Sequence, residues 1–118
     1  MGTFNWVFQI SGMNGGPARE IEATVDTGAA YTTLPARVLH ELGVEPTGQR
    51  RFLLADGRRV DMDVGRAWIT INGSSEVTVV AFGEDDAPPL LGAYTLEGLG
   101  LAVDPTSQRL VPTHLIMY

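Results

Sequence analysis

The sequence predicts an all-β fold with one or two short helices. Apolar residues alternate with polar ones over several short stretches, the period-two pattern of half-buried strands. Glycine-containing dipeptides with a strong turn preference separate these stretches, among them Asp56-Gly57 and Asn72-Gly73. Only the segment after Pro35 shows convincing helical spacing. At 118 residues, the chain is expected to be one domain spanning residues 1–118.

The first two strands are expected over residues 3–10 and 19–25, joined by a glycine-containing loop over 11–17. Both segments alternate: Phe4, Trp6, Phe8 and Ile10 in the first, and Ile21, Ala23 and Val25 in the second. These two strands are adjacent in sequence, so they are expected to form a hairpin.

A helix is expected to follow, beginning near Pro35 and ending at Gly43. Proline suits a first helical turn and glycine a helix end. Between them, apolar side chains fall at helical spacing: Val38, Leu39 and Leu42.

The rest of the chain is expected to form hairpins. Residues 52–54 and 60–64 flank Asp56-Gly57, and residues 68–71 and 77–81 flank Asn72-Gly73. An acidic loop over 84–89 leads to Leu90-Leu91-Gly92 and a short helix over 93–98. A last hairpin pairs 101–103 with 109–112, before an apolar tail over 114–118.

Composition excludes several classes of function. The net charge of −6 disfavours nucleic acid and anionic membranes as partners. The absence of cysteine rules out disulfides and thiolate metal sites, and the two histidines lie too far apart in sequence for an ordinary zinc site. We therefore expect no metal and no cofactor. Without a signal segment or a long apolar run, a cytoplasmic protein with no membrane partner is expected.

One segment carries chemistry, Asp26-Thr27-Gly28-Ala29. It follows an apolar strand, and an inward-pointing carboxylate there costs several kcal/mol unless it is hydrogen-bonded. Thr27 offers a hydroxyl donor, and Gly28 allows a tight turn that points amide groups at the carboxylate. The alternative for Asp26 is an ordinary turn residue that caps a strand end.

This segment, with Thr32 after it, resembles the catalytic loop of the aspartic proteases, and of the retropepsin branch in particular. Leu90, Leu91 and Gly92 match the late apolar pair and glycine that support that loop. Leu54, Ala55, Asp56 and Gly57 stand where the family carries its substrate-covering flap, although Asp56-Gly57 also fits a plain surface hairpin. The chain resembles small bacterial and archaeal members of this family more than viral ones. The resemblance implies a closed β-barrel with a flap hairpin.

The resemblance implies an endopeptidase that works as a homodimer on polypeptide substrates. Asp-Thr-Gly occurs only once, so a second copy would supply the second Asp26, and the two carboxylates would activate one water. Thr27 would link the two loops, and the Gly28 amide would bind the carboxylate. Leu54, Val80 and Leu91 would favour hydrophobic substrate side chains. Residues 4–10 and 115–118 are candidates for a dimer sheet.

Two departures from the viral pattern leave an alternative open. Viral retropepsins carry an acid shortly after the catalytic loop and an arginine after the late glycine, which brace the dimer. Here these positions are Ala30 and Ala93. The alternative is a non-catalytic peptide-binding or scaffold domain with the same fold. A nucleic-acid-binding barrel fits poorly, because only one small basic cluster, around Arg50-Arg51 and Arg58-Arg59, interrupts an acidic chain.

Overall fold

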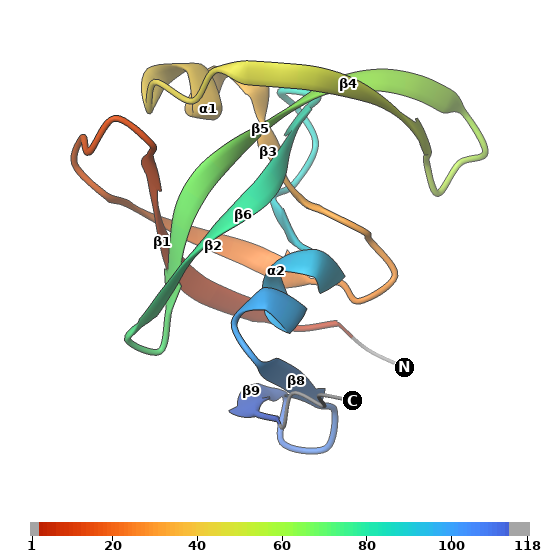
Figure 1. The fold of residues 1–118 in the computed structure, drawn as a ribbon. Coiled ribbons are helices and arrows are strands. Elements are labelled where there is room, and N and C mark those ends of the chain that lie inside the picture. Colours follow the sequence, from red (N-terminus) through yellow and green to blue (C-terminus); the bar gives the residue numbers. More distant parts are fainter. Residues whose placement is uncertain (1–2, 114–118) are drawn as a thin grey trace, which may run out of the picture.

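A computed structural model describes residues 3–113 of the protein (Figure 1). The described part contains strands throughout and two short helices. In chain order these are β1 (Asn5–Gly12), β2 (Arg19–Val25), β3 (Thr32–Pro35), α1 (Ala36–Glu41), β4 (Pro46–Leu53), β5 (Arg59–Ile71), β6 (Ser74–Gly83), β7 (Leu90–Leu91), α2 (Ala93–Gly98), β8 (Leu101–Asp104) and β9 (Arg109–Pro112).

The main sheet closes on itself. Its strand order is β1-β2-β7-β3-β6-β5-β4, and an additional antiparallel pairing of β1 with β5 joins the two sides of the sheet into a ring. Strand β4 stands outside this ring as the outer partner of β5, and β8 and β9 form a separate two-stranded sheet. The predicted all-β fold with short helices is confirmed, and its main sheet closes into a ring.

The core fills the inside of the ring. The largest fully buried side chains come from strands on all sides and from α1: Phe8, Ile10, Leu34, Leu39, Ile69, Ile71 and Leu91. Each such side chain contributes about 1.5–3 kcal/mol when it leaves water. This core fixes the ends of β2 and β7, where the candidate site lies.

Most predicted segments are present. Strands β1 and β2 form the expected hairpin, and β8 pairs with β9. Asn72 and Gly73 have φ of 53° and 86°, so both residues between β5 and β6 are left-handed, as the predicted Asn-Gly turn requires. Helix α1 ends at Glu41, and the predicted stop residue Gly43 follows its C-cap with a φ of 76°, in the left-handed region.

Four boundaries differ from the prediction. Strand β1 runs on to Gly12, because its end pairs with β5. Pro35 ends β3 instead of opening the first helical turn, and β3 itself was not predicted. Strand β4 begins at Pro46, well before residue 52, and β5 is one continuous strand where two were predicted. The predicted apolar tail over 114–118 lies outside the described residues.

Candidate functional site

Asp26 stands at the end of β2, in a turn that supplies its hydrogen bonds. Val25 before it is buried, whereas Asp26 itself is half-buried. The Gly28 N–H donates to Asp26 Oδ1 at 3.0 Å, and the Ala29 N–H donates to the Asp26 carbonyl at 3.1 Å. The tight turn thus directs a backbone amide to the carboxylate and leaves part of it open to solvent.

Strand β7 holds both arms of this loop. It runs parallel to β2, with Val25 opposite Leu91, and antiparallel to β3, with Thr33 opposite Leu90. The Asp26 N–H donates to the Leu91 carbonyl at 3.0 Å. The late apolar pair predicted to support the loop therefore lies between the strands that enter and leave it.

Gly92 packs directly against the backbone of the same loop. A Cβ atom on Gly92 would lie 2.5 Å from the Tyr31 carbonyl carbon and 2.8 Å from the Thr32 nitrogen, so no other residue fits without a shift. Beyond it, the N–H groups of Ala93 and Tyr94 donate to the carbonyls of Ala29 and Ala30 at 2.9 and 3.0 Å. The first residues of helix α2 are therefore hydrogen-bonded directly to the Asp26 loop.

A buried network of threonine hydroxyls lies beneath these contacts. Thr32 Oγ1 is 2.6 Å from Thr95 Oγ1, which is 3.0 Å from Thr78 Oγ1, and the Gly92 N–H donates to Thr32 Oγ1 at 3.1 Å. All three threonines are buried. The sequence pattern does not predict this network. A lone Thr78 within an apolar strand was the only signal, and nothing marked Thr95 as its partner.

A small hollow opens beside Asp26. Its volume is about 190 Å³, and besides Asp26 and Thr27 its walls come from the N-terminal strand region and from the β8–β9 hairpin, through Phe4, Val103 and Pro105. Thr27 is exposed at the rim. The Asp26 carboxylate therefore has access to space that a water or a polar group of a substrate can enter.

The predicted flap is a hairpin turn between β4 and β5. The Leu54 N–H donates to the Arg58 carbonyl at 2.8 Å, the Gly57 N–H donates to the Leu54 carbonyl at 2.9 Å, and Gly57 has a φ of 88°. The Asp56 carboxylate accepts the Arg58 N–H at 3.0 Å and Arg58 Nε–H at 2.8 Å. These backbone and side-chain hydrogen bonds lower the pKa of Asp56.

The hairpin extends beyond the ring (Figure 1) and is tied to the rest of the molecule at two points. Near its tip, Arg58 Nη2 lies 3.2 Å from Glu84 Oε1 in the acidic loop after β6. On β4, just before the turn, the ring of Phe52 meets that of Tyr31 edge to face, with centroids 6.0 Å apart. Through Tyr31, this end of the hairpin contacts the segment that follows Asp26.

One expectation about side chains at the site is wrong. Val80 and Leu91 are fully buried in the core, with no exposed surface, so they cannot contact a substrate. Both residues belong to strands that form the ring, and the inward-facing side chains of these strands fill the barrel. Leu54 lies at the hairpin turn and is half-buried.

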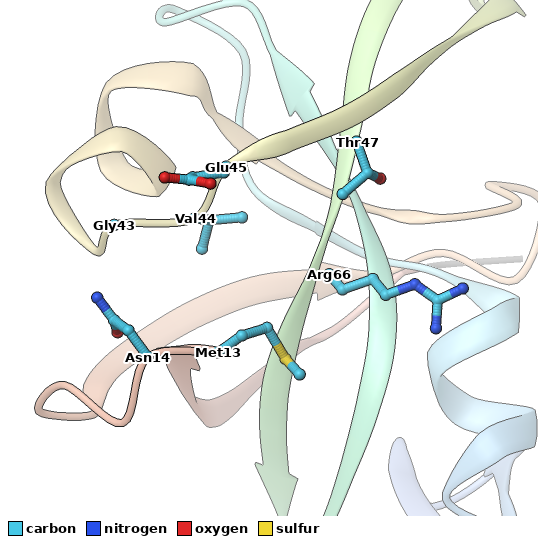
Figure 2. Close-up of a pocket in the computed structure, with 7 residues that line it drawn as sticks. All are labelled: Met13, Asn14, Gly43, Val44, Glu45, Thr47 and Arg66. Carbon is cyan, nitrogen blue, oxygen red and sulfur yellow. The ribbon is translucent and has the colours of Figure 1, made fainter.

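A pocket of about 330 Å³ lies elsewhere, between the β1–β2 loop, the segment after α1 and β5. Figure 2 shows Glu45 and Arg66 at its edges and Met13 and Val44 between them. It shares no residue with the Asp26 loop, the hairpin turn or the Leu90–Gly92 segment.

Within residues 3–113, no cluster of three His, Asp or Glu residues has the arrangement of a metal site. Over the same residues, neither helix is long and apolar enough to cross a membrane.

Comparison with known proteins matches the chain to a family. The sequence profile described as "Aspartyl protease" covers residues 9–95, from β1 into α2. Among curated proteins, none matches this chain significantly.

Several solved structures share the fold. A retropepsin-like aspartic protease from Rickettsia conorii has a TM-score of 0.57 at 21% identity, over 89% of this chain and 91% of the other. The EIAV protease complexed with the inhibitor HBY-793 also has a TM-score of 0.57, at 19% identity, over 98% of this chain and 94% of the other. The simian foamy virus protease in solution has a TM-score of 0.52 at 16% identity, over 78% and 92%.

Proposed function

Because this chain belongs to the aspartyl protease family, we propose that it is an aspartic endopeptidase whose active site forms between two copies, each contributing one Asp26. The chain is proposed to act as one domain in one subunit. The observation that carries the proposal is the Asp26 turn. The Asp26 carboxylate accepts the Gly28 N–H, the Asp26 backbone N–H donates to the Leu91 carbonyl of β7, and the half-buried residue lines a hollow.

Two copies are needed because the chemistry takes two carboxylates. Asp-Thr-Gly occurs once in the sequence. A two-fold dimer, the commonest symmetry among homo-oligomers, would bring Asp26 and Asp26 of the second copy together. The exposed Thr27 beside it supports this arrangement, since its side chain is available to a partner.

The proposed reaction follows from the shared proton of such a pair. Two carboxylates in contact cannot both ionise, so one is protonated and the other is not. The ionised Asp26 takes a proton from a water, the resulting hydroxide attacks the peptide carbonyl carbon, and the protonated Asp26 donates to the carbonyl oxygen. Collapse of the tetrahedral intermediate breaks the C–N bond as a proton passes to the leaving nitrogen.

The hairpin turn is proposed to cover an extended polypeptide substrate. Leu54, Ala55, Asp56 and Gly57 would exclude water and pair with the substrate backbone. Leu53, just before the turn, is 67% exposed, so its side chain is accessible to a substrate.

The proposal is tested by incubating the protein and its Asp26→Asn variant, at high concentration and from mildly acidic to neutral pH, with a complex peptide mixture. New termini are identified by mass spectrometry, and dimers by sedimentation. We expect cleavage by the wild type, sensitive to a pepstatin-type inhibitor, and none by the variant. Equal cleavage by both proteins would overturn the role of Asp26.

The alternative is a peptide-binding domain that does not cleave. The observation that favours it is the pair of alanines, Ala30 and Ala93, at the positions where viral retropepsins carry the charged dimer brace. A folded, dimeric wild type that binds peptides but produces no new termini would support this alternative. The cytoplasmic location stays a prediction.

A further inference from the structure

A second hollow lies beside the Asp26 loop, on the side of α2 and β4. Its volume is about 420 Å³. It shares no lining residue with the hollow beside Asp26, so the two are separate places on the surface. Its lining combines two alanines, three aromatic residues (here called the wall), two arginines of β4 (here called the rim) and Glu97.

Two alanines line the hollow. The side chains of Ala30 and Ala93 end at Cβ and so take little space. The Tyr94 N–H donates to the Ala30 carbonyl at 3.0 Å, which fixes the two backbones against each other. This part of the hollow is therefore held together by backbone hydrogen bonding, and the small side chains leave it open.

Three aromatic rings form the walls, one from each neighbouring segment. Tyr31 of the Asp26 loop meets Phe52 of β4 at 6.0 Å and Tyr94 of α2 at 5.8 Å, with interplanar angles of 77° and 87°. These edge-to-face contacts hold the rings in place before any ligand arrives. Tyr94 remains 51% exposed, so apolar ring surface is left for a further partner.

The rim carries a positive charge. Arg50 Nη1 donates to the Gln49 carbonyl at 2.9 Å, but in the described part of the chain no carboxylate lies within ion-pair distance of Arg50. Its neighbour Arg51 is paired with Asp61 at 3.1 Å. Glu97 also lines the hollow, and it comes from α2 rather than β4. The β4 rim is thus complementary to an acidic group.

We propose that this hollow is a specificity pocket for an aromatic side chain of the polypeptide substrate, with an acidic substrate residue beside it at Arg50. The inference rests on the proposed function and names the substrate class. Because the pocket is separate from the hollow at Asp26, the aromatic residue lies away from the cleaved bond. The recognised feature is an aromatic-acidic pair at a fixed distance from the scissile bond.

The pocket can be tested without cleavage, in the Asp26→Asn background. Four otherwise identical fluorescent peptides carry Phe-Asp, Ala-Asp, Phe-Ala or Phe-Lys at the same place, and their binding is measured by anisotropy. We expect Phe-Asp to bind most tightly. Replacing Phe by Ala, or changing Tyr94→Ala in the protein, weakens binding about tenfold, the loss expected for an aromatic contact.

Matched variants separate the roles of the wall and the rim. Tyr94→Phe keeps the ring and is expected to bind Phe-Asp normally, as is Trp68→Ala, which removes an exposed ring that does not line the pocket. Arg50→Gln is expected to weaken the preference for Phe-Asp over Phe-Ala about threefold. Arg37→Gln, which removes an exposed arginine of α1, is expected to leave that preference unchanged.

The outcomes are distinct. Equal binding of the Phe and Ala peptides, or an unchanged preference in a folded Tyr94→Ala variant, overturns the pocket. A Tyr94→Ala variant that loses dimerisation and not peptide preference overturns it too, because the hollow is then a contact between copies. Tight Phe-Asp binding together with no cleavage by the wild type leaves the pocket standing and refutes the proposed catalysis.

Discussion

The Asp26 loop and the β4–β5 hairpin are held in place by different interactions. The loop is fixed by backbone hydrogen bonds to β7 and α2, by the close packing of Gly92 and by buried hydroxyls. The hairpin projects outward on an exposed strand, and its ion pairs, such as Arg58 with Asp56 and Arg51 with Asp61, are at the surface. Buried contacts hold the Asp26 loop, and solvent-exposed contacts hold the hairpin.

This difference suits the two proposed roles. A catalytic carboxylate must stay within a fraction of an ångström of its geometry, which buried and fully hydrogen-bonded groups achieve. A cover must open and close, and segments with few buried apolar contacts do so at low free-energy cost. Along β4 only Phe52 is even half-buried. Changes in the loop should therefore cost far more stability than changes in the hairpin.

The largest effect is expected for Gly92→Ala. Its new Cβ would lie 2.5 Å from the Tyr31 carbonyl carbon, so the loop or α2 must move. We expect unfolding in urea to show a loss of about 3 kcal/mol, at the upper end of the cost of overpacking. Gly16→Ala is the control, because its Cβ would meet only Asn14 Oδ1, at 3.5 Å. That control should change stability by less than about 0.5 kcal/mol. Similar losses in both variants would contradict the packing role of Gly92.

A smaller effect is expected for Thr95→Val. Valine keeps the shape of the side chain but removes the hydroxyl that joins Thr32 and Thr78. Leaving buried hydroxyls without a partner costs about 1–3 kcal/mol. Thr95→Ser keeps the hydroxyl and should recover part of this loss in the same urea experiment. A serine variant as unstable as the valine variant would show that the methyl group, and not the network, carries the stability.

The segments that form and support the Asp26 loop could be predicted, because each is marked by a short sequence motif. Asp26-Thr27-Gly28 follows an alternating strand, and Leu90-Leu91-Gly92 precedes a short helix, so both segments were located by pattern and by resemblance. The turns at Asp56-Gly57 and Asn72-Gly73 were predicted from dipeptides that tolerate a positive φ. Both Asn72 and Gly73 adopt a positive φ, whereas in the other turn Gly57 does and Asp56 does not.

The features that were not predicted depend on contacts between residues distant in sequence. Strand β4 was mostly missed because it lies outside the ring, so its side chains face solvent and show no alternation. Strand β5 was split in two because Val64 and Gly65 are both buried, which interrupts the period of two beside the irregular pairing at Pro46. The contact of Thr95 with Thr32 joins residues 63 apart, which no local pattern marks.

The smallest effect is expected at the hairpin tip, and it should depend on pH. Hydrogen bonds from the Arg58 N–H and from its side chain lower the pKa of Asp56 below its ordinary value of 3.8. A carboxyl group whose folded pKa is depressed stabilises the protein fully above the unfolded value, and this contribution is lost as pH falls through the folded pKa. Asp56→Asn removes the charge, so its small deficit in unfolding free energy at neutral pH should shrink as pH falls below 3.8 and close below the folded pKa, in paired urea titrations. Salt should narrow the deficit too, because the Arg58–Asp56 pair is exposed. A deficit that persists at low pH would show that the hairpin depends on the geometry of its turn and not on charge.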